Sequence, residues 1–147
     1  MLFKRFLAIS FLLGRLWADG FSPQELVLTP GGQIAVGDVQ PGQALLGVNP
    51  ETGEVEPCQV AAVYWLHDWP TVNLQLDEGS IQCAANQVLL NSDGYWVLAS
   101  DLTAGDRLRR EDGSSVAIHG ISLETAYADA VAFAVEPHHT LCVGPQG

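Results

Sequence analysis

The sequence predicts an all-β domain built from two related halves. Its 147 residues are 48% hydrophobic and 16% charged, which is enough apolar material for one packed core. Short apolar runs are separated by Gly, Pro, Asn and Asp, and no stretch carries a long helical period. A segment around Asp38 also returns around Asp101. These observations favour a duplicated fold of short strands and hairpins, and they exclude a mostly disordered chain.

Residues 1–18 are similar to a secretory signal peptide. A short basic start is followed by an apolar run from Phe6 to Gly14, and Ala18 supplies a small residue before polar Asp19. The run is shorter than the roughly 20 apolar residues of a membrane-spanning helix. We therefore expect residues 1–18 to be a removable leader outside the fold, residues 19–147 to form the domain, and the protein to be secreted or periplasmic. An uncleaved anchor or an amphipathic N-terminal helix is the alternative.

The charge of the chain excludes two classes of partner. The formal net charge is −11, and from Asp19 onward 3 basic residues face 17 acidic ones, a net charge of −14. Nucleic acids and anionic membranes are polyanions, so neither is an expected partner once the leader is removed. No cofactor or metal is expected. The partner class stays open between a protein and a small ligand, and the sequence does not indicate an oligomeric state.

Several elements can be placed in order along the chain. Residues 71–76 alternate apolar and polar side chains, a turn follows, and Ile81 restarts a strand, which is the pattern of a hairpin with one buried face. Residues 96–102 have room for one helical turn. The predicted strands, each bounded by a turn signal or alternating in character, are Leu26–Thr29, Ala44–Val48, Thr71–Leu76 and Ala130–Val135.

The internal repeat has a constant spacing. Residues 37–45 align with residues 100–108, so Asp38 and Asp101 lie 63 positions apart (101 − 38). A second pairing has an offset of 59 (131 − 72). It sets Val72, Leu74, Leu76 and Cys83 opposite Val131, Phe133, Val135 and Cys142. A chain whose halves match in this way is expected to fold as two related β-lobes around a pseudo-two-fold axis.

The duplication and a series of local motifs resemble the Hint domain of Hedgehog proteins, inteins and bacterial intein-like modules. The resemblance covers about residues 20–147. The matching segments are Phe21–Gly32 for the opening strand, Gly37–Gly42, Ile81–Gln87 in the place of the T-x-x-H block, Gly94–Val97, Asp101–Asp106, and Val135–Thr140 with Val143–Gly144 in the place of the H-T-aromatic block.

That resemblance implies a self-inflicted acyl shift. In the family, the first residue of the domain is a Cys or Ser that attacks the preceding carbonyl and forms a thioester or ester. The Thr and His of T-x-x-H polarise the bond and protonate the leaving amine. Splicing members then use a penultimate His and a terminal Asn, whereas Hedgehog-like members pass the acyl group to an outside nucleophile.

Carried over residue by residue, this machinery is substituted. The nucleophile position holds Gly20, and the Thr and His positions hold Ala84 and Gln87. Of the catalytic set only His139 remains, as a vestigial candidate. The resemblance therefore implies a degenerate, non-enzymatic Hint module with a binding or structural role. The alternative is an autoprocessing domain belonging to a longer chain, since the family continues for several residues beyond the position of Gly147.

Cysteine and histidine offer other chemistries. In an oxidising compartment Cys58, Cys83 and Cys142 allow at most one internal bridge, and burial of all three as small apolar residues is the alternative. A hydrolytic pair of Cys83 or Cys142 with His139 has suitable residue types, and His138, His139 and Cys142 could form part of a metal site. Both are disfavoured, the second because the ligands lack a partner pair. His67 and His119 are expected to be solvated or hydrogen-bonded.

Aromatic residues gather around His67. Tyr64, Trp65 and Trp69 are either a platform for a carbohydrate or peptide, or a cover that closes a strand pair over the core. The cover is the favoured interpretation. Acidic turns at residues 51–56 and 77–78 are expected to be solvated surface rather than a cation site.

Overall fold

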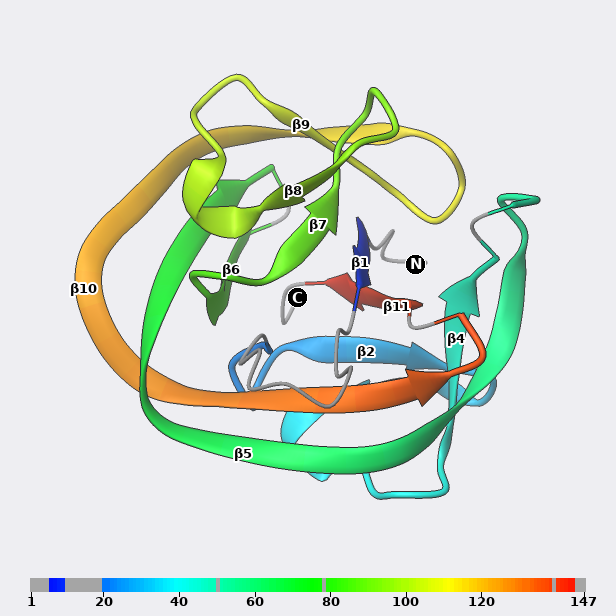
Figure 1. Ribbon diagram of the computed structural model, residues 1–147. Coiled ribbons are helices and arrows are strands. Elements are labelled where there is room, and N and C mark those ends of the chain that lie inside the picture. The colour runs from blue at the N-terminus through cyan, green and yellow to red at the C-terminus, as the bar shows by residue number, and fades with distance from the viewer. Residues whose placement is uncertain (1–5, 10–19, 50, 78, 139, 145–147) are drawn as a thin grey trace.

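The computed structural model describes residues 6–9, 20–49, 51–77, 79–138 and 140–144, and these form strands and two 3-10 turns (Figure 1). Within these ranges no helix is long and apolar enough to cross a membrane. The elements are β1 (Phe6–Ile9), β2 (Leu26–Thr29), β3 (Gly32–Ala35), η1 (Val36–Asp38), β4 (Ala44–Val48), β5 (Val55–Leu76), β6 (Gly79–Ala84), β7 (Val88–Leu90), β8 (Trp96–Leu98), η2 (Ala99–Asp101), β9 (Arg107–Arg109), β10 (Ser115–Glu136) and β11 (Thr140–Gly144).

The strands form two sheets. One has six strands in the order β3-β2-β11-β1-β7-β8, and the other has the order β4-β5-β10-β9 with β6 paired to β5. The long strands β5 and β10 pair antiparallel with each other and curve together around the outside of the molecule (Figure 1). Register shifts along this pair provide the bends that allow the curvature.

The predicted all-β class and the predicted duplication are confirmed. The turns η1 and η2 begin 63 positions apart (99 − 36), as do β4 and β9 (107 − 44). The hairpin β2–β3 is matched by the hairpin β7–β8, and each of β4 and β9 pairs with the long strand that follows it. Strands β2–β5 and β7–β10 are thus two successive copies of one arrangement. Each copy is followed by one further strand, but β6 pairs with β5 whereas β11 pairs with β1 and β2. Strand β1 precedes both copies.

The predicted hairpin is also present. Thr71 pairs with Ala84 and Leu74 with Ile81 across the β5–β6 turn. Alternation buries Leu74 and Ile81 fully, so one face of the hairpin joins the core as the pattern requires. The core of both copies is continuous, and its largest fully buried apolar side chains are Phe21, Phe133, Leu45, Leu74, Ile81, Leu89, Leu108, Ile118 and Leu141.

Tyr64 and Trp65, two of the three aromatic residues around His67, do not cover the core as expected, whereas Trp69 is half-buried. Tyr64 and Trp65 lie on the outer curve of β5 and are 47% and 46% exposed. The ring of Trp65 approaches Gly37 of η1, where an added Cβ would lie 3.4 Å from Trp65 Cη2. Because β5 runs along the outside of the curved β5–β10 pair, one of its faces is exposed to solvent. The alternation in the sequence did not reveal which residues lie on that face.

The N-terminal segment departs further from expectation. Residues 1–18 were expected outside the fold, yet Phe6–Ile9 form β1, a strand between β11 and β7 in the full chain (Figure 1). An apolar run suits an interior strand as well as it suits a leader, which is why composition did not separate the two. Removal of the leader itself stays a prediction.

Candidate functional site

The candidate site is built around Phe21, which contacts strands from both halves of the chain. Phe21 forms antiparallel bridges with Cys83 of β6 and Val131 of β10. Its backbone N–H donates to the Val131 carbonyl at 3.1 Å, and its carbonyl accepts from the Val131 N–H at 2.8 Å. The side chain is 1% exposed. Phe21 therefore fixes the start of the domain between β6 and β10, and with it the position of Gly20.

Gly20 is held by the two residues that occupy the Thr and His positions. Its N–H donates to Gln87 Oε1 at 2.9 Å, and its carbonyl accepts from the Ala84 N–H at 2.8 Å. The structure thus brings together Gly20, Ala84 and Gln87, three positions that the sequence places up to 67 residues apart. The N–H that Gln87 binds belongs to the peptide bond between residues 19 and 20.

No space exists for a side chain at Gly20. A Cβ there would lie 2.7 Å from the Val131 carbonyl oxygen and 2.9 Å from its carbon. The φ angle of Gly20 is +140°, a backbone conformation that side-chain-bearing residues rarely adopt. The void beside Gly20 and Gln87 measures about 10 Å³, at the lower limit for one water molecule. The backbone of β10 thus fills the space that a nucleophilic side chain would need.

Gln87 points its acceptor, not its donor, at the peptide nitrogen. Its side chain is 2% exposed, and its Nε2 donates to the Val88 carbonyl at 3.0 Å. An acyl shift requires that the leaving amine gain a proton, and a carboxamide oxygen has none to give at neutral pH. The hydrogen bond to Gly20 therefore positions the backbone and supplies no acid.

Replacing Gln87 by leucine should lower the free energy of unfolding by about 1–3 kcal/mol, because the buried Gly20 N–H loses its acceptor. Urea unfolding followed by tryptophan fluorescence measures the effect. The matched control is Gln75→Leu on an exposed position of β5, which should change stability little. Equal stability of the two variants would contradict the assigned role of the Gln87–Gly20 hydrogen bond.

The three cysteines form no disulfide and all are buried. Burial raises the pKa of the Cys58 thiol to about 11, and burial, followed by the nearby Glu25 carboxylate, raises the pKa of Cys83 further. A thiol with a raised pKa supplies almost no thiolate at neutral pH, so neither is prepared for nucleophilic attack. Cys142 is fully buried in β11. Of the two alternatives, burial of all three cysteines without a disulfide is observed.

We expect the folded chain to resist thiol-modifying reagents at pH 8, since the reactive thiolate is scarce and Cys58, Cys83 and Cys142 are buried. Intact mass after iodoacetamide treatment should record no rapid adduct on the native chain and three adducts after unfolding. Rapid modification of a single cysteine in the native chain would instead favour the alternative of a hydrolytic cysteine–histidine pair.

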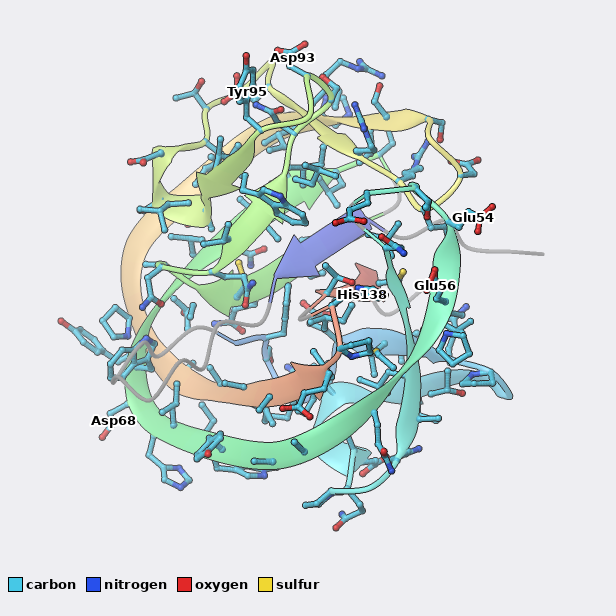
Figure 2. All side chains as sticks on the ribbon, turned by 45° about the vertical axis from the view of Figure 1, so that its right-hand side comes forward. Glu54, Glu56, Asp68, Asp93, Tyr95 and His138 are labelled. Atoms are coloured by element: carbon cyan, nitrogen blue, oxygen red, sulfur yellow. The ribbon has the colours of Figure 1, made fainter. Side chains whose placement is uncertain are left out.

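The three histidines that the structure describes each bond to a carboxylate, and none of these contacts involves Gly20. His138 Nε2 lies 3.2 Å from Glu56 Oε1, and Figure 2 shows the two side chains near the start of β5. A hydrogen bond from Asn49, then one from His138, lowers the pKa of the Glu56 carboxyl. His67 lies 3.0 Å from Asp129, and His119 bonds to Asp77, both at exposed positions as expected. His139, the vestigial candidate, lies outside the described residues.

In the part of the chain that the structure describes, no three His, Cys, Asp or Glu side chains converge. Of the metal-site candidates, Cys142 is buried in β11 and His138 bonds to Glu56.

Two supporting residues were missed from the sequence. Glu25 is 5% exposed, and its carboxylate accepts the N–H of Gln82, whose carbonyl in turn accepts the N–H of Ser22. Val131 supplies the carbonyl that excludes a side chain at Gly20. Nothing in the sequence around Glu25, which lies beside an apolar run, indicates that its carboxylate is buried. The contact between Val131 and Gly20 joins backbone positions 111 residues apart (131 − 20), so it produces no local sequence pattern.

Comparisons with known proteins agree with this architecture. The family whose model matches the chain is the pretoxin Hint domain, over residues 26–147. A bacterial intein-like domain from Clostridium thermocellum is 26% identical with a TM-score of 0.80, over 85% of this chain and 92% of that chain. The DnaX mini intein from Spirulina platensis is 16% identical with a TM-score of 0.71, over 87% and 96%. No curated protein matches the sequence.

Proposed function

Because this chain belongs to the pretoxin Hint domain family, we propose that it is an exported Hint module without self-cleaving or protein-splicing activity, serving as a non-catalytic binding or structural domain. The family assignment supplies the fold and the expected reaction. The loss of that reaction is inferred from the residues around Gly20.

One observation carries the proposal: the N–H of Gly20 donates to Gln87 Oε1 while the Val131 carbonyl fills the side-chain space at Gly20. An acyl shift at this bond needs both a nucleophile and a proton donor, and this arrangement has neither. The buried thiol of Cys83 is adjacent in the fold, but its raised pKa argues against its acting as a replacement.

Export is part of the proposal and depends on the leader-like sequence of residues 1–18. If the leader is removed after Ala18, the mature chain starts at Asp19 and carries a net charge of −14. A binding role toward a protein or small ligand is then more compatible with the surface than binding to nucleic acid.

The test is the intact mass of the full chain bearing one tag at each end. Cell-free synthesis without membranes keeps signal peptidase away, and the purified chain is then incubated with dithiothreitol or hydroxylamine, which cleave thioesters and esters. We expect one species of full-length mass under all conditions. A product cut between residues 19 and 20, or near Gly147, would instead favour an autoprocessing domain from a longer chain.

Export is measured separately, by secretion of the same chain from a bacterial host. The exported species should start at Asp19 and keep its C-terminal tag. If the chain is instead found in the membrane fraction with residues 1–18 still attached, those residues are an uncleaved anchor and not a removable leader.

A further inference from the structure

Strand β1 joins two parts of the molecule that otherwise do not pair. It is antiparallel to β11, from Phe6 opposite Val143 to Ile9 opposite Thr140, and antiparallel to β7, with Ala8 opposite Leu89. Without it, the six-stranded sheet would divide into β3-β2-β11 and β7-β8. The continuity of this sheet thus depends on four residues that belong to neither copy of the duplication.

Those four residues lie within the predicted leader. Removal of residues 1–18 would take β1 away and leave β11 and β7 facing each other across a gap one strand wide, about 9–10 Å between their backbones. Both strands would then present unpaired N–H and C=O groups to the gap. Their side chains include Leu89, Leu141 and Val143, all 2% exposed or less in the full chain.

We propose that the slot between β11 and β7 is a strand-acceptor site, and that its ligand in the exported protein is an extended apolar segment of a partner protein bound antiparallel to both strands. The uncleaved chain fills the slot with Phe-Leu-Ala-Ile. Binding by strand addition takes its affinity from backbone hydrogen bonds, which here are available on two edges. This names a partner class for the binding role proposed above, on which it depends.

Charge defines the ligand further. In this chain the strand is preceded by Lys4 and Arg5, whereas residues 19–147 carry a net charge of −14. Opposite charge speeds association and favours one class of partner over another. The preferred ligand is therefore an apolar, proline-free strand with basic residues just before it.

The experiment starts from the full chain, with a specific protease site introduced between Gly14 and Asp19. After folding, the protein is cut and mixed with a fluorescent peptide of residues 1–12. We expect the cut leader to remain bound and to exchange for the labelled peptide in a saturable manner. A peptide with Ala8→Pro should bind more than about tenfold more weakly, because proline lacks the N–H and does not fit an interior strand. Replacing Lys4 and Arg5 by glutamate should weaken binding and reverse its dependence on salt, because salt then screens a repulsion from the acidic domain instead of an attraction to it.

Two results would overturn the proposal. One is a cut domain that keeps its near-ultraviolet circular dichroism, releases the leader and takes up no peptide. The other is a domain that unfolds on losing the leader and is not restored by the peptide, whereas recovery with added peptide supports the slot. Neither result depends on cleavage at Gly20, so a failed strand-acceptor site is distinguishable from a failed proposal of lost self-processing.

Discussion

Replacing Gly20 by cysteine is expected to lower the free energy of unfolding by about 2–4 kcal/mol and to yield no product cut between residues 19 and 20. The new Cβ would lie 2.7 Å from the Val131 carbonyl oxygen, at a φ of +140°. To relieve this steric clash, the Phe21–Val131 bridge must shift, and that bridge joins the start of the domain to β10. Even with a thiol in place, Ala84 and Gln87 leave the bond without an acid.

A matched control separates the two contributions to this loss of stability, which are backbone strain and the close contact with the Val131 carbonyl. Gly32 has a φ of +130° with nothing within 4 Å of its added Cβ, so Gly32→Cys carries the backbone strain alone. Urea unfolding should find Gly20→Cys less stable than Gly32→Cys by the cost of the contact with Val131. Equal losses would contradict the steric account. Cleaved product from Gly20→Cys, read by intact mass, would contradict the account of the chemistry.

The second large effect is expected at Gly47, where β4 passes β11. A Cβ there would lie 2.4 Å from the Thr140 carbonyl oxygen and 2.7 Å from Thr140 Oγ1. That hydroxyl accepts from the Val48 N–H at 2.8 Å and donates to the Val48 carbonyl at 2.7 Å. Gly47→Ala must push the strands apart and break both bonds, and we expect it to cost about 3 kcal/mol or more.

Thermal and urea unfolding of Gly47→Ala measure this loss. Gly120→Ala is the control, because Gly120 also lies in a strand and an added Cβ there meets only Gln75 Cγ at 4.0 Å. The control should stay within about 1 kcal/mol of the parent chain. A parent-like Gly47→Ala would mean that β4 and β11 can separate without penalty.

The sequence predicted those features of the fold that repeat or alternate. The constant offset between Asp38 and Asp101 predicted that the segments around them would have the same structure, and each segment does contain a 3-10 turn, η1 or η2, ahead of a strand. Alternation predicted the hairpin of residues 71–84, since side chains on one face must all reach the core. The presence of Gly20, Ala84 and Gln87 in one site followed from the family resemblance.

Contacts that depend on backbone approach could not be predicted in this way. The Val131 carbonyl beside Gly20 and the Thr140 carbonyl beside Gly47 are main-chain atoms, which every residue type has. The pairing of β1 depends on two strands that become neighbours only in the folded sheet. The outward direction of Tyr64 and Trp65 depends on the curvature of β5, which no local pattern encodes.

The position of β1 also sets the order of events during synthesis. Phe6 leaves the ribosome first, but its partner Val143 follows 137 residues later (143 − 6). Contacts between distant residues form late, because the conformational entropy of closing a long loop is lost before the contact contributes any stabilising energy. The β7 partner of Ile9, Val88, is made 79 residues after it (88 − 9), so residues 6–9 stay unpaired until at least that point, and the sheet closes around them only when β11 follows. If residues 1–18 are the leader that we propose, early targeting would remove β1 before β7 and β11 are in place, whereas late targeting would have to extract β1 from a sheet that already contains it.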